Sequence, residues 1–200
     1  VFIPNKPPSA GEWGPAMGYG DGLALAEIQI LGKRLFPSMS QFQIVSDRNR
    51  LDEFRDSNLV IIGGGKHNAV YRQLVEELRP GIHFFDTDTE DFKEIRNATR
   101  SIIYSSEYKN GKIDSDLGLI LWCRRPSTQK IVLILAGSHT YGSWAAAQFL
   151  TVAKNVRPLI KYRDTGLELV VRCSISGNQV FPASPESALR RLGEGSGCDE

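Results

Sequence analysis

The stretch Leu59-Val60-Ile61-Ile62-Gly63-Gly64-Gly65 decides the fold class, because four apolar residues of strand length run directly into three glycines. Beyond the glycines, apolar residues recur at helical spacing over Ala69–Leu78, and Pro80-Gly81 ends the pattern. An apolar strand that leads through a tight turn into a helix is typical of an α/β protein whose sheet is covered on both faces. This unit therefore predicts a parallel sheet between helices.

The same alternation of strand-like and helical patterns extends in both directions from this stretch. Strands are predicted at 1–3, 42–45, 59–62, 82–85, 117–122, 130–135 and 167–173, and helices at 23–35, 49–54, 69–78 and 143–153. Hairpins are predicted at the Asn110-Gly111 turn between 101–104 and 108–112, across 124–128, and across 176–178. We expect a three-layer α/β sandwich with a mainly parallel, flavodoxin-like sheet and antiparallel hairpin additions. Residues 1–192 would form a single domain and 193–200 a flexible tail.

Composition argues against several classes of function. The 200 residues include 24 Lys and Arg against 23 Asp and Glu, so no overall charge favours a nucleic acid or an anionic membrane as partner. No apolar run reaches the roughly 20 residues of a membrane helix. Cys123, Cys173 and Cys198 lack metal-ligand spacing, which predicts neither a disulfide framework nor zinc and indicates a cytoplasmic location. The chain begins at Val1 rather than at an initiator Met, so we expect a domain of a longer protein.

Three glycine-rich segments are predicted to lie at one edge of the sheet. The segments 63–68 and 137–143 follow strands, and 11–22 leads from the first strand to the first helix. At such an edge, helix N-termini present free N–H groups to a ligand. We therefore predict ligand contacts from Asp21, Gly63, Gly64, Gly65, Asn68, Arg72, Ser138, His139, Tyr141, Gly142 and Ser143. The alternative is structural, since glycines also permit tight turns and close packing.

Neither turn matches an established nucleotide-binding motif. A P-loop needs a lysine after its second glycine, which 137–143 lacks, and Gly65-Lys66 has no glycine five residues before it. Position 68, where a dinucleotide fingerprint would place its third glycine, is Asn68. The residues around Ser138 do not form the serine elbow of a hydrolase. We expect no cofactor and no metal, and a small anionic or nucleotide-like ligand held by the turns.

His139 offers a second kind of chemistry, because an imidazole at this edge can act as acid, base or ligand. Asp21 is predicted as the N-cap of the helix 23–35, and its carboxylate could also bind a ribose hydroxyl or serve as a base. One alternative function is therefore a nucleotide or NAD glycohydrolase that uses Asp21 or Glu27 with His139. Another is an oligomerisation module without a ligand.

Three blocks in this order resemble a family of known proteins. They are Gly20-Asp21-Gly22-Leu23-Ala24-Leu25-Ala26-Glu27-Ile28, then Asn58 to Gly65 with Asn68 and Arg72, then Asp116 to Ile120 through Val132 to Ala146. Their spacing is similar to that of an uncharacterised α/β domain found at the C-terminal end of bacterial regulatory proteins, behind DNA-binding or repeat modules. The resemblance covers most of residues 1–153, and Gly65 and Arg125-Pro126 depart from the family pattern. It implies a ligand-sensing or effector module of a signalling or defence protein, with the other domains of the parent chain as partners.

Overall fold

The computed structural model describes residues 2–3, 18–35, 45–46, 51–64, 68–84, 94–97, 102–177, 179–187, 189 and 191–192. The strands of its main sheet are β1 (Phe2–Ile3), β2 (Val45–Ser46), β3 (Leu59–Ile62), β7 (Glu107–Lys109), β8 (Lys112–Arg124), β9 (Ile131–Gly137), β10 (Leu167–Ser176), β11 (Gln179–Val180) and β12 (Ser184–Pro185). A smaller sheet consists of β4 (Ile82–Phe84), β5 (Glu94–Asn97) and β6 (Ile102–Ser105). The helices are α1 (Tyr19–Leu35), η1 (Leu51–Phe54), α2 (Ala69–Leu78), α3 (Thr140–Thr151), α4 (Ala153–Val156) and η2 (Arg157–Tyr162).

The prediction of a mainly parallel, flavodoxin-like sheet is wrong. The strand order is β11-β10-β8-β9-β3-β1-β2, most neighbours are antiparallel, and the sheet is strongly curled. Among the described strands, parallel pairing joins β1 to β2 and β3, and β3 to β9. The connections explain this, because parallel neighbours need a crossover of a dozen or more residues, whereas residues 125–130 join β8 directly to β9. The helix α3 then leads from β9 to β10 on the far side of β8, so these two strands run parallel without touching.

Other predictions were correct where local signals determine the structure. The strand β3 and the helix α2 have the predicted bounds, and α2 ends at Arg79, which adopts the left-handed conformation and donates its N–H to the Val75 carbonyl. The turns that join β8 to β9 and β10 to β11 form the predicted hairpins. The first helix begins at Tyr19, so Asp21 occupies its first turn rather than its N-cap.

The hairpin predicted between 101–104 and 108–112 has the right turn but the wrong strand. Asn110 and Gly111 join β7 to β8, whereas β6 pairs with β5 in the smaller sheet. The strand β5 lies in a segment for which no strand was predicted. Residues 42–44 of a predicted strand, most of the loop 11–22 and the tail 193–200 lie outside the described residues.

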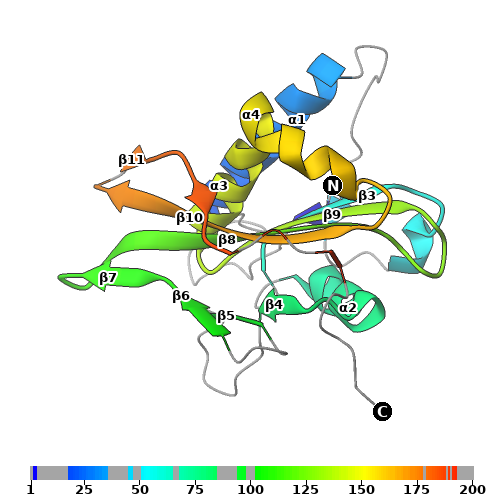
Figure 1. The fold of residues 1–200 in the computed structure, drawn as a ribbon, viewed down its shortest axis with the longest axis horizontal. Helices are drawn as coiled ribbons and strands as arrows, with labels where there is room; N and C mark the ends of the chain where they lie inside the picture. Colours follow the sequence, from blue (N-terminus) through cyan, green and yellow to red (C-terminus); the bar gives the residue numbers. More distant parts are fainter. Residues whose placement is uncertain are drawn as a thin grey trace, which may run out of the picture.

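Helices cover both faces of the main sheet (Figure 1). On one face, Ala24, Leu25 and Ile28 of α1 and Phe149 of α3 pack with residues such as Leu135 of β9. On the other face, α2 and the smaller sheet form the second core, which includes Val70, Tyr71, Leu74, Phe84, Ile95, Leu119 and Ile134. The alternation of side chains along each strand separates these two cores. None of the described helices is long and apolar enough to span a membrane.

Candidate functional site

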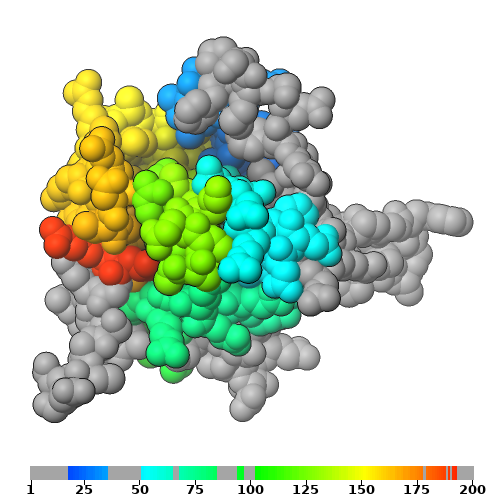
Figure 2. Space-filling view, turned by 90° about the vertical axis from the view of Figure 1, so that its right-hand side faces the viewer, coloured from blue at the N-terminus to red at the C-terminus, as the bar shows by residue number. Residues whose placement is uncertain are grey.

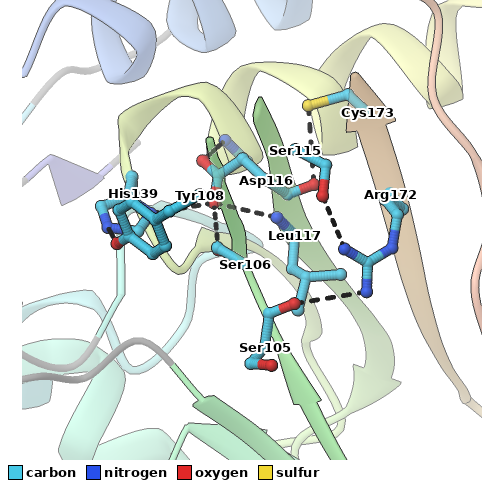
Figure 3. A network of polar contacts seen from close by, with 10 residues as sticks. Ser105, Ser106, Tyr108, Ser115, Asp116, Leu117, His139, Arg172 and Cys173 are labelled. Atoms are coloured by element: carbon cyan, nitrogen blue, oxygen red, sulfur yellow. Dashed lines mark hydrogen bonds and ion pairs between the residues drawn. The ribbon is translucent and has the colours of Figure 1, made fainter. Parts of the chain in front are cut away.

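A buried carboxylate organises the edge of the sheet where β9 leads into α3 (Figure 3). Asp116 lies on β8, and its Oδ2 accepts the Gly142 N–H at 2.6 Å. Its Oδ1 accepts the Ser106 hydroxyl and the Leu117 N–H, each at 2.9 Å. The first N–H groups of a helix have no partner within the helix, and the N-cap residue of α3, His139, makes no capping bond with its side chain. Asp116 therefore caps α3 from the neighbouring strand.

His139 connects this carboxylate to the surface. Its Nδ1 lies 3.1 Å from Asp116 Oδ1, and its Nε2 lies 2.7 Å from the Tyr108 hydroxyl oxygen. Because a carboxylate only accepts hydrogen bonds, Nδ1 carries the proton, and in the neutral imidazole Nε2 accepts from Tyr108. Exposure rises along this chain, from 0% for the Asp116 side chain to 20% for His139 and 48% for Tyr108. The three side chains form a hydrogen-bonded chain from the core to the solvent.

The β7–β8 hairpin places Tyr108 beside His139. Asn110 and Gly111 both have positive φ angles, 52° and 73°, as a two-residue hairpin turn requires. The register of the two strands shifts between Glu107 and Tyr108, and an irregularity of this kind can redirect a side chain. The Tyr108 and His139 rings meet edge to face, with centroids 5.8 Å apart. Residues from two segments far apart in the sequence thus meet in one contact.

A second polar network fixes the base of this hairpin. Arg172 of β10 donates to the Ser115 hydroxyl at 2.7 Å, to the Ser105 carbonyl at 3.3 Å and to Glu186 at 3.0 Å. The Ser115 hydroxyl in turn donates to Glu107 at 3.2 Å. Figure 3 shows this network next to the Asp116 cluster, with Arg172 on one side and His139 on the other. The hairpin that carries Tyr108 is thereby attached to the sheet.

Ser138 has a hydroxyl that the fold leaves unsatisfied. Its Oγ is buried without a hydrogen-bond partner, although its N–H donates to the Leu117 carbonyl at 3.0 Å. A buried hydroxyl without a partner costs about 1–3 kcal/mol, so such groups in native proteins call for an explanation. Ser138 directly precedes His139 in the turn.

The two predicted glycine turns do lie together, but their contacts are those of close packing. The Gly63 N–H donates to the Leu135 carbonyl at 2.9 Å, and a Cβ on Gly64 would lie 3.2 Å from the Gly137 carbonyl oxygen. A Cβ on Gly142 would lie 1.9 Å from the Leu117 carbonyl oxygen, so no side chain fits there. Gly65 lies outside the described residues. Gly137 and Gly142 allow α3 to approach the sheet, and Gly64 allows the two turns to lie against each other.

The two polar residues predicted for ligand binding near α2 differ in burial. Asn68 is fully buried and caps α2: its Oδ1 accepts the Tyr71 N–H and its side-chain amide donates to the Ile62 carbonyl, both at 3.1 Å. Arg72, one turn further along α2, is exposed. In the other predicted turn, Ser143 is buried and Tyr141 is partly exposed.

The carboxylates of the predicted glycohydrolase site lie on α1. Asp21 is buried in the first turn, and the N–H of its neighbour Gly20 donates to Thr140 Oγ1 at 2.8 Å. Glu27 lies six residues further, about 9 Å along the helix. The carboxylate that His139 contacts is Asp116 instead. Among the described residues no group of three or more His, Cys, Asp or Glu side chains is arranged to hold a metal ion.

No family model, curated protein or solved structure matches this chain. The family resemblance and the signalling role that it implies therefore stay predictions.

Sequence reasoning missed two members of the site. Asp116 immediately precedes a run of apolar residues that the structure buries. A charged residue at the start of such a run could have indicated a buried carboxylate. Tyr108 carried no comparable signal, because its position depends on the pairing of β7 with β8.

Proposed function

We propose that this domain is a ligand-binding module that recognises a small polar molecule at the surface formed by Tyr108 and His139. The observation that carries the proposal is the His139 imidazole, held in one orientation by a fully buried carboxylate. Capping of α3 does not explain this histidine, because Asp116 supplies the cap and an Asp, Asn, Ser or Thr at position 139 would be a better one.

The geometry favours an uncharged ligand over the anion predicted from the sequence. The chain's own side chains already accept N–H groups at the start of three helices: Thr140 at α1, Asn68 at α2 and Asp116 at α3. An anion at the α3 turn would compete with the Asp116 carboxylate for the Gly142 N–H and would be repelled by its charge. A molecule with hydroxyl or amide groups would instead donate a hydrogen bond to the Tyr108 oxygen, whose own hydrogen is directed to His139 Nε2.

A thermal-shift panel tests this proposal. It would contain uncharged nucleosides, sugars and amides beside their phosphorylated or carboxylated counterparts. We expect at least one uncharged compound to raise Tm, and its effect to be lost in Tyr108→Phe and in His139→Gln, which no longer orients the Tyr108 hydroxyl. His83→Gln is the matched control, because His83 lies on β4 in the smaller sheet. The proposal fails if no compound shifts Tm, if only anions do, or if the shift persists in His139→Gln.

A further inference from the structure

We infer that Tyr108 is an activated nucleophile that accepts an acyl group from an activated ester or acyl-imidazole. The inference rests on the proposed binding surface and names the substrate class that would react there. Nucleophilic catalysis needs a nucleophile within hydrogen-bond reach of a base, and a third group that orients the base. Tyr108, His139 and Asp116 stand in this relation, at 2.7 Å and 3.1 Å.

The structure supports each part of this arrangement. His139 Nε2 is an acceptor because Nδ1 faces a carboxylate, so Nε2 can take the phenolic proton. Asp116 is held by Gly142, Ser106 and Leu117, so the orientation of the imidazole is set by the fold. Tyr108 is half exposed, and an electrophile can therefore approach its oxygen.

The reaction follows from these positions. The Tyr108 oxygen attacks the acyl carbonyl carbon and forms a new carbon–oxygen bond, while its proton passes to His139 Nε2. The bond to the leaving group breaks, and the leaving group takes that proton from His139. Water, deprotonated by His139, then attacks the acyl-tyrosine, releases the carboxylic acid and restores the phenol. The sum is hydrolysis of the acyl compound by one water molecule.

A second role for the same contact is purely structural, since the Tyr108–His139 hydrogen bond also attaches the β7–β8 hairpin to the start of α3. The two roles differ in the reactivity of the phenol. Tyr19 is the internal standard, because it is 71% exposed and more accessible than Tyr108. If accessibility alone set the rate, Tyr19 would react faster.

The test is acetylation of the whole chain by N-acetylimidazole at pH 7.5, with the rate at each tyrosine measured by peptide mass spectrometry. We expect Tyr108 to react about tenfold faster than Tyr19 or more, within the range that a positioned base contributes. His139→Gln should lower the Tyr108 rate to that of Tyr19 and leave the Tyr19 rate unchanged. Asp116→Asn should also lower the Tyr108 rate, and Tyr108→Phe should remove the adduct at this position.

Two results would overturn the inference: a Tyr108 rate no higher than that of Tyr19, or a high rate that persists in His139→Gln. The His139→Gln variant keeps the test decisive if Asp116→Asn does not fold. Failure here is distinguishable from failure of the proposed function. A ligand-induced thermal shift without fast acetylation would leave the binding module intact, and fast acetylation without any shift would contradict the binding module alone.

Discussion

At the scale of single residues, the buried charge of Asp116 distinguishes this fold from a simple packed sheet. Its two oxygens accept hydrogen bonds from the Gly142 N–H at the start of α3, from the Ser106 hydroxyl and from the His139 ring. Removal of one partner from such a network leaves the other buried groups unsatisfied, which costs more than the bond itself contributes. The stability of the domain and the orientation of His139 therefore depend on the same side chain.

Asp116→Asn should lower the free energy of unfolding by about 2–4 kcal/mol. The NH₂ group of the new amide would face hydrogen-bond donors of the protein, and those donors would lose their acceptor. Urea denaturation measures the loss. Asp114→Asn is the control on the same strand: Asp114 is exposed, and its replacement should change stability by less than about 0.5 kcal/mol. Equal losses in the two variants would contradict the assigned role of Asp116.

The described cysteines should be inert thiols in the native state. Burial, with the nearby negative charges of Glu77 and Glu168, raises the pKa of Cys123 to about 12, and burial beside Asp116 raises that of Cys173 to about 12. At pH 8 both are protonated and hence unreactive. A Cys198→Ser variant should therefore show no rapid reaction with a disulfide reagent until it is unfolded in guanidinium chloride, when two thiols react. Rapid native reaction would contradict the burial of these side chains.

At the scale of elements, a partly buried ion pair holds α2 to the turn between β8 and β9. Arg125 donates to Glu77 through Nη2 at 2.8 Å and Nε at 3.1 Å, and its side chain is buried. Figure 2 shows the β8–β9 turn (lime) between the segment that includes η1 (cyan) and the residues that lead into β10 (orange). This end of β9 is opposite to the end that carries His139. The pair therefore contributes to the scaffold rather than to the site.

Glu77→Gln should make the free energy of unfolding less dependent on pH in the acidic range. Burial alone would raise the pKa of Glu77, but the hydrogen bonds from Arg125 and Ser127 outweigh it and lower this pKa below its usual value. The ionised Glu77 side chain therefore stabilises the folded protein fully above the pKa of this group in the unfolded chain, about 4.3. This stabilisation is lost as pH falls through the lower pKa that Glu77 has in the folded protein. The variant should be about 1–2 kcal/mol less stable at pH 7, with a smaller difference at pH 3. Urea titrations at the two pH values measure this, and a constant difference would contradict the assignment.

At the scale of the whole molecule, local signals predicted elements, but not how distant elements meet. The unit of β3 and α2 was predictable, since the apolar run 59–62, the helical spacing of apolar residues over 69–78 and the Pro80-Gly81 stop follow one another in the sequence. Whether the strands run parallel or antiparallel was not predictable, because this depends on the position of the long strand β8 between β10 and β9. The candidate site was predictable only through His139: its partners come from β8 and from the register of β7.

The fold holds His139 in one tautomer between Asp116 and Tyr108. Nitrogen NMR of the imidazole tests it directly. We expect the neutral ring to carry its proton on Nδ1 and to show an unprotonated, hydrogen-bonded Nε2, with the Nε2 shift altered by Tyr108→Phe while Nδ1 keeps its proton. A proton on Nε2, rapid averaging between the two tautomers, or an Nε2 shift that does not respond to Tyr108→Phe would show that His139 is not held in this way.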